Sequence, residues 1–246
     1  MSIQLTDPPL FAALFAGACF SFLSRKLTLA AAITGFLCSL IIYSGTGYPG
    51  IFCLGVFFIS GTLATAWGRR KKEVLERTGD STQRKYGQVL ANGGAATLFA
   101  FFAIFFPVCR EIFTVMLAAS LSSATSDTLS SELGMIYGKR FYNCLTWRKE
   151  PAGLDGVVSI EGTLAGLFGA ALIAAIYTIG SLLKETVQLI NYTFPIILFA
   201  GMAGNVMDSI FGATLERKKI LKNDGVNFIT TLIAGVIAGL LYLLIN

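Results

Sequence analysis

The apolar residues of this chain come in long runs separated by short polar segments. Eight such runs cover residues 8–24, 27–44, 49–66, 87–106, 111–134, 157–180, 190–212 and 226–245. Each is close to the length, about 20 residues, at which an α-helix crosses a hydrocarbon core of about 30 Å. The pattern predicts an all-α fold: a polytopic bundle of about eight transmembrane helices, forming a single membrane domain over residues 1–246.

Composition supports a membrane protein and narrows its chemistry. Hydrophobic residues make up 54% of the chain and charged residues 13%, whereas soluble domains carry about 25% charged residues. The five cysteines occur singly, mostly inside apolar runs, and we interpret them as small core residues. The sequence has no histidine, which excludes histidine-based acid–base catalysis and zinc–histidine sites.

Basic residues fall on alternate loops of the predicted bundle. The loops after the first, third, fifth and seventh runs hold 17 of the 19 Lys and Arg residues, leaving Arg110 and Lys184 on the other side. Because positive charge stays on the cytoplasmic side, we expect these loops in the cytoplasm and both termini outside. The expected location is the plasma membrane of a prokaryote. Topology and anionic lipid account for the net charge of +5, so no nucleic-acid partner is expected.

Acidic and amide side chains gather where the apolar runs meet these basic loops, and the outer ends show nothing similar. The candidate site residues are Asn92, Asp127, Lys139, Arg140, Asp155, Glu161, Asn205, Asp208, Asp224 and Asn227. Ionisable residues within a membrane are costly and therefore indicate function. The pattern predicts that the polar chemistry lies at the cytoplasmic face.

Asp127 and Asp208 are the strongest candidates, because each lies in an apolar helix with no basic residue within one turn. An unpaired buried carboxylate is costly, and Mg²⁺, held by one or two carboxylates plus substrate phosphates, would offset that cost. We predict Asp127 and Asp208 as catalytic Mg²⁺ ligands, with Asp155 as a further ligand. An alternative is that the carboxylates are interhelical hydrogen-bond partners and that Gly61, Gly162, Gly166 and Gly169 serve close helix packing.

Six segments resemble, in order, the motifs of an integral-membrane family named for transmembrane protein nineteen. They are GTLATAWGRRKKE, GQVLANG, SDTLSSELG, GLDGVVSIEGTLAG, GNVMDSIFGATLE and NDGVNF. The resemblance covers nearly the whole chain. That family includes the plant and cyanobacterial phytyl-phosphate kinases, so the resemblance implies an enzyme acting on isoprenyl phosphates.

A weaker resemblance is to CDP-diacylglycerol synthases and to dolichol and phytol kinases. It is carried by Asp127-Thr128, Gly138-Lys139-Arg140, Ser159-Ile160-Glu161-Gly162 and the segment from Gly204 to Ser209. Two departures stand out. The two lysines of the family's serine–proline motif are absent, with Asp155-Gly156-Val157-Val158 at this place, and Asn205 stands where an acid is typical. By this analogy CTP is the expected donor.

The expected function is that of a Mg²⁺-dependent kinase transferring a phosphoryl group from a nucleoside triphosphate, CTP by analogy, to an isoprenyl monophosphate. Lys139 is expected to act in catalysis. Asn92, Arg140, Asp155, Glu161, Asn205, Asp224 and Asn227 are expected to bind substrate or phosphate. The sequence has no Walker A motif, so no P-loop of the soluble type is expected. Alternatives are a CDP-lipid-forming cytidylyltransferase and a transporter or flippase without chemistry, which would place polar groups near the midplane.

Overall fold

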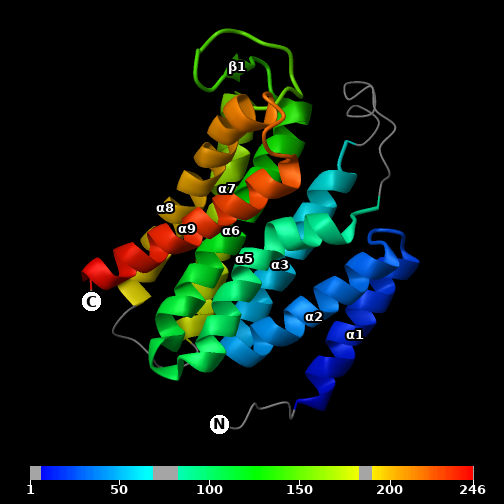
Figure 1. Ribbon diagram of the computed structural model, residues 1–246, viewed down its shortest axis with the longest axis vertical. Coiled ribbons are helices and arrows are strands. Elements are labelled where there is room, and N and C mark those ends of the chain that lie inside the picture. Colours follow the sequence, from blue (N-terminus) through cyan, green and yellow to red (C-terminus); the bar gives the residue numbers. More distant parts are fainter. Residues whose placement is uncertain (1–6, 69–82, 183–189, 246) are drawn as a thin grey trace.

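The computed structural model describes residues 7–68, 83–182 and 190–245, and their fold is an all-α bundle (Figure 1). The helices of these segments are α1 (Pro8–Leu23), α2 (Leu29–Thr46), α3 (Tyr48–Ala66), α5 (Tyr86–Phe105), α6 (Arg110–Tyr137), α7 (Ile160–Leu182), α8 (Ile190–Phe211) and α9 (Asn223–Ile245). A 3₁₀ turn, Pro107–Cys109, precedes α6, and a π-helical turn, Gly212–Glu216, extends α8. The predicted polytopic bundle is confirmed.

Helix α6 forms the centre of the bundle and contacts α3, α5, α7, α8 and α9. Its middle carries the buried polar residues Ser120, Ser122, Ser123, Thr125 and Ser126. By length and composition, α2, α3, α5, α7, α8 and α9 qualify as membrane spans, whereas α6 does not. Because its neighbours cover it, α6 tolerates hydroxyl side chains that lipid would penalise.

Glycines of α7 allow its close approach to α6. A Cβ atom at Gly162 would lie 2.8 Å from the Ser130 carbonyl oxygen, and one at Gly169 would lie 3.0 Å from the Thr125 carbonyl oxygen. A Cβ atom at Gly166 would lie 3.1 Å from the Ser126 carbonyl oxygen. Close helix packing is therefore confirmed for Gly162, Gly166 and Gly169, whereas Gly61 faces Arg84 and Thr128.

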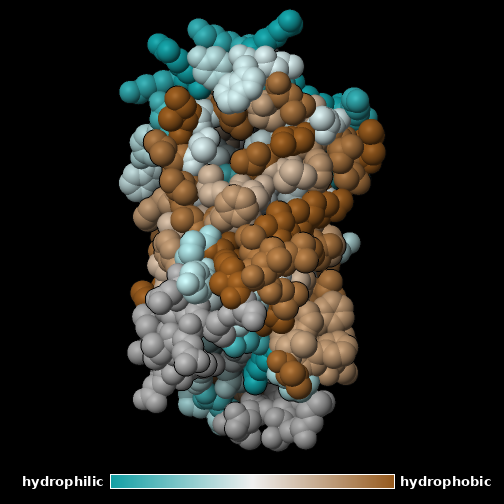
Figure 2. Space-filling view, turned by 90° about the vertical axis from the view of Figure 1, so that its left-hand side faces the viewer, coloured by the Kyte–Doolittle hydropathy of each residue, from teal (hydrophilic) through white to brown (hydrophobic). Residues whose placement is uncertain are grey.

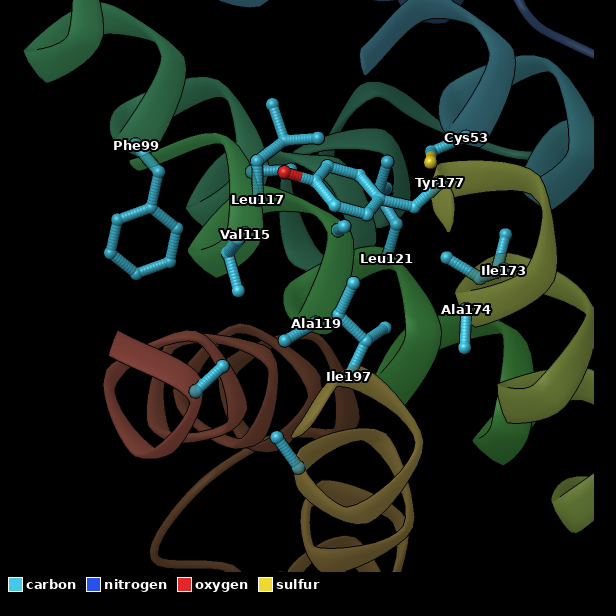
Figure 3. Close-up of a cluster of buried hydrophobic side chains, with 14 of the residues drawn as sticks. Cys53, Phe99, Val115, Leu117, Ala119, Leu121, Ile173, Ala174, Tyr177 and Ile197 are labelled. Carbon is cyan, nitrogen blue, oxygen red and sulfur yellow. The ribbon is translucent and has the colours of Figure 1, made fainter. Parts of the chain in front are cut away.

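The outer surface is apolar around the middle of the bundle and polar at the end beyond α6 and α7 (Figure 2). Inside, Leu117 and Leu121 of α6, Ile173 of α7 and Ile197 of α8 form part of one continuous apolar core (Figure 3). This is the distribution expected of a membrane-embedded bundle. The core lies below the polar end and fixes how the helices converge there.

Three predicted helix boundaries were wrong by three residues each. Helix α6 continues to Tyr137 instead of ending at residue 134. The run expected to begin at residue 157 does not start helically: Val157 and Val158 form strand β2 (Val157–Val158), which pairs antiparallel with β1 (Tyr142–Asn143). Helix α9 begins at Asn223 instead of 226. At the starts of α7 and α9, backbone pairing or a local turn, rather than hydropathy, sets the boundary.

The described parts of the basic loops lie at one end of the bundle, as the loop alternation predicts. The amide of Thr28 donates to the Arg84 carbonyl, and Arg217 pairs with Glu150, so neighbouring loops contact each other there. Arg110 lies at the opposite end and donates to the Gly45 carbonyl. Arg69, Arg70, Lys71, Lys72, Arg77 and Lys184 lie outside the described residues.

Candidate functional site

A polar cavity of about 340 Å³ lies between the ends of α6 and α8, the π turn after α8, and the hairpin segment between α6 and α7. Figure 1 shows this hairpin segment projecting beyond α6 and α7. The polar side chains that line the cavity are Asp127, Ser130, Ser131, Glu132, Asp155, Ser159, Asn205, Asp208, Ser209, Glu216 and Asn223. The cavity therefore brings together residues that are up to 96 positions apart in the sequence.

Asp127 of α6 and Asp208 of α8 meet in this cavity, with their carboxyl groups within hydrogen-bonding reach of each other. The Thr230 hydroxyl of α9 donates to Asp208 Oδ1 at 3.3 Å. The Ser131 hydroxyl, one turn beyond Asp127 on the same face, donates to the Asp127 carbonyl oxygen at 2.9 Å. Two charged carboxylates this close repel each other, so the pair requires a shared proton or a bound cation.

Asn205 of α8 links this helix to α6 beside the cavity. Its side chain is buried, and its Nδ2 donates to the Ser126 hydroxyl at 3.0 Å. Gly166 of α7 makes room for this contact, because a Cβ atom there would come within 2.6 Å of Asn205 Nδ2. Asn205 thus lines the cavity and locks the helix that carries Asp208, one turn away.

The hairpin segment closes the cavity and is anchored to the turn after α8. Arg217 donates to Glu150 at 2.6 Å and to the Asp155 carbonyl oxygen at 2.7 Å. The Arg217 hydrogen bond holds the pKa of Glu150 below its ordinary value. Gly156, at φ +70°, lies against Ala213, where a Cβ atom would come within 2.6 Å of the Ala213 nitrogen. These contacts place Asp155 at the cavity wall.

Glu132 and Glu216 line the cavity but were not among the predicted site residues. Glu132 lies five residues after Asp127, a spacing that does not place two residues on the same α-helical face. Glu216 ends the π turn, in which the Arg217 amide bonds to the Gly212 carbonyl five residues earlier. A π turn is common at functional sites, but hydropathy does not reveal it. Both acids lie within segments that carry the family resemblance, SDTLSSELG and GNVMDSIFGATLE, and this was the available signal.

The remaining predicted residues lie around the cavity rather than in its lining. Lys139 and Arg140 are exposed, and the Lys139 amide points to Glu161 Oε2 at 3.4 Å. Asn92 donates to the carbonyl of Gln88 within its own helix. Asp224 and Asn227 also lie outside the cavity lining. Asp224 lies against Gly87, and the buried Asn227 Oδ1 has no hydrogen-bond partner within the described residues. The substrate and catalytic roles assigned to these residues stay predictions.

The charge of the cavity differs from that of the loops around it. Five of its lining residues are acidic, and among the described residues no Lys or Arg lines it. Carboxylate and amide oxygens suit a hard cation such as Mg²⁺. No three acidic, cysteine or histidine side chains in the described segments converge as a complete metal site. The donor set therefore fits Mg²⁺ only where phosphate and water oxygens complete the coordination.

Comparison with known proteins places the chain in a family. The family model for the integral membrane protein DUF92 matches residues 12–235. The chain is 37% identical to the uncharacterized membrane protein MJ0933 of Methanocaldococcus jannaschii, over 89% of this chain and 86% of that protein.

Two further relatives come from photosynthetic organisms. The uncharacterized membrane protein sll0875 of Synechocystis is 34% identical over 80% of this chain and 76% of its own. Protein VTE6, chloroplastic, of Arabidopsis thaliana is 29% identical over 82% of this chain, which spans 61% of that protein. No solved structure matches the chain significantly. The chain thus belongs to the DUF92 family of integral membrane proteins.

Proposed function

We propose that this protein is a lipid-phosphate kinase that transfers a phosphoryl group from a nucleoside triphosphate to an isoprenyl monophosphate. The observation that carries the proposal is the meeting of Asp127 and Asp208 in a polar cavity at the basic end of an otherwise apolar bundle. The resemblance of six sequence segments to a family that includes phytyl-phosphate kinases supports the isoprenyl acceptor, and CTP is the donor by analogy.

The position of the cavity suits a reaction between a water-soluble and a lipid-soluble substrate. A nucleoside triphosphate cannot enter the hydrocarbon core, whereas an isoprenyl chain gains about 0.8 kcal/mol per buried methylene by staying there. The two phosphate groups must therefore meet near the headgroups. A cavity at one end of the bundle meets this need, and it disfavours a transporter, whose substrate groups bind near the midplane.

The acidic lining determines how the anionic substrates would be held. Asp127 and Asp208 would hold Mg²⁺, with Asp155 as a further candidate, because carboxylates alone would repel phosphate groups. Bound Mg²⁺ would neutralise charge on the transferred phosphoryl group and align it. The protein need not supply a nucleophile, since an oxygen of the acceptor phosphate can attack the terminal phosphorus and release the nucleoside diphosphate. Asn205, which donates to Ser126 of α6, and Thr230 of α9, which donates to Asp208, would keep α8 in register with these helices.

The proposal can be tested with purified protein in nanodiscs, γ-labelled CTP and a panel of isoprenyl monophosphates. We expect a Mg²⁺-dependent labelled isoprenyl diphosphate, and we expect Asp127→Asn to abolish it. Asp7→Asn is the matched control, because Asp7 lies at the opposite end of the bundle and accepts from Tyr48. Release of pyrophosphate with formation of a CDP-lipid would instead identify a cytidylyltransferase, and no turnover with any donor would contradict the proposed chemistry.

A further inference from the structure

Arg84 is a half-buried cation close to the cavity but is not one of the residues that line the cavity. It lies in the segment that enters α5, where its amide donates to the Lys26 carbonyl and its carbonyl accepts from the Thr28 amide. These two backbone hydrogen bonds fix the position of the residue. Burial lowers the pKa of its guanidinium, and the charge of Glu132 opposes this shift. A guanidinium nevertheless stays charged at neutral pH.

The guanidinium reaches inward over Gly61 of α3. A Cβ atom at Gly61 would lie 3.3 Å from Arg84 Nη2 and 3.5 Å from Thr128 Cγ2 of α6. Among the described residues only the Thr65 hydroxyl accepts a side-chain hydrogen bond from Arg84, at 3.3 Å. A guanidinium has five N–H donors in a fork that matches phosphate oxygens. Arg84 therefore has donors available for an anion, and the missing side chain at Gly61 lets its guanidinium lie close to α3.

Arg84 also lies at headgroup depth. Exposed Lys26 and Lys85 flank it, and nearby Trp67 donates from its indole to the Tyr137 hydroxyl at 2.8 Å, a pair typical of the membrane–water interface. Leu63 of α3, two residues before Thr65, is 64% exposed, as a lipid-facing residue would be. Glu132, whose charge acts on Arg84, lines the acidic cavity. A phosphate held by Arg84 would therefore lie beside the cavity, on the flank of α6 that faces α3 and lipid.

We propose that Arg84 binds the phosphate of the membrane-embedded acceptor lipid, so that the lipid approaches from the α3 side of α6. The nucleotide then approaches from the hairpin side. This inference rests on the proposed function, because it assigns one of the two substrates of that reaction to a separate subsite. In this arrangement a cationic site binds the lipid phosphate, and an acidic site binds the metal–nucleotide complex. The ligand class is a phosphomonoester carried on an apolar chain.

Binding without turnover gives the direct test. Wild-type protein in nanodiscs is titrated with farnesyl phosphonate in the absence of nucleotide, and binding is followed by native mass spectrometry. Arg84→Gln should weaken binding about tenfold to a hundredfold, the effect of losing charge-assisted hydrogen bonds. Arg84→Lys should fall between, since lysine keeps the charge and loses the fork. The matched control is Lys85→Gln, which removes a neighbouring exposed charge and should leave binding within about twofold.

A second variant tests geometry at constant charge. Gly61→Ala would push a methyl group against the guanidinium and should also weaken phosphonate binding. In steady-state assays Arg84→Gln should raise the KM for the lipid phosphate and leave the KM for the nucleotide unchanged. Unaltered phosphonate binding by Arg84→Gln would overturn the proposal. It would also be overturned if Arg84→Gln weakened the binding of phosphatidylglycerol as much as that of the phosphonate, or if only the KM for the nucleotide rose. The phosphonate-binding measurement needs no catalysis. It therefore tests the role of Arg84 even if no phosphoryl transfer is detected.

Discussion

At the scale of single residues, the Asp127–Asp208 pair carries the first prediction. Asp127→Asn and Asp208→Asn should each lower kcat by about a hundredfold or more, because losing one ligand removes several kcal/mol of charge stabilisation. The apparent Mg²⁺ requirement should rise in parallel. Steady-state assays over a Mg²⁺ titration measure both effects, and near-wild-type activity at limiting Mg²⁺ would show that the substituted residue is not a ligand.

The same two variants should not lower the stability of the metal-free protein. Each substitution relieves the repulsion between two carboxyl groups that lie within hydrogen-bonding reach, and asparagine can still accept the hydrogen bond from Thr230. Thermal unfolding in detergent without Mg²⁺ measures this. A marked fall in Tm for both variants would favour the alternative that the pair is mainly a structural link between α6 and α8.

Sequence reasoning found the central pair but not the full lining. Asp127 and Asp208 were recognisable because each interrupts an apolar run, and Asn205 because it lies one turn before Asp208. Glu132 and Glu216 lie near helix ends, and the π turn that positions Glu216 has no hydropathy signal. Lys139 and Arg140 follow Asp127 closely in sequence, but α6 continues to Tyr137 and leaves them beyond the cavity.

At the scale of helices, the contact between α6 and α7 depends on glycine. Gly162→Ala should destabilise the protein by about 1–3 kcal/mol, because the new methyl group meets backbone atoms that cannot rotate away. Gly55→Ala on α3 is the matched control: nothing lies within 4 Å of its Cβ position, so stability should be unchanged or slightly raised. Thermal unfolding measures both, and equal Tm values for the two variants would contradict the packing argument.

The hairpin segment should depend on the ion pair between Glu150 and Arg217, which are 2.6 Å apart. Glu150→Gln should increase hydrogen–deuterium exchange in residues 141–157 at neutral pH, with Lys149→Gln as the control. The pKa of Glu150 lies below its ordinary value because Arg217 donates to the carboxylate. The contact is therefore fully present above the ordinary glutamate pKa and is lost as pH falls through the lowered one. Unchanged exchange in Glu150→Gln would mean that the other contacts of Arg217 and Gly156 are enough to hold the hairpin segment in place.

Helix identities followed well from hydropathy, since lipid contact requires long apolar runs. Helix α6 differs from the other helices in being less apolar. Its residues Ser120, Ser122 and Ser123 are buried against other helices rather than lipid. A single sequence shows that such a helix is less apolar but does not show which neighbours cover it. The start of α7 was misplaced for a related reason, because Val157 and Val158 are as hydrophobic as helix residues and pair instead with β1.

At the scale of the whole molecule, the orientation in the membrane is the remaining prediction. The described parts of the basic loops cluster at the hairpin end, and Cys109, the last residue of the 3₁₀ turn at the opposite end, is exposed. Positive charge on the cytoplasmic side then places Cys109 outside and the exposed Lys219 inside. A membrane-impermeant maleimide added to intact cells should label the wild-type protein, and Cys109→Ser should lose that label. A cysteine introduced as Lys219→Cys into the Cys109→Ser background should react only after the cells are opened. Labelling of residue 219 in intact cells would reverse the orientation and place the acidic cavity outside, away from cytosolic nucleotide, so this one measurement tests topology and the proposed chemistry together.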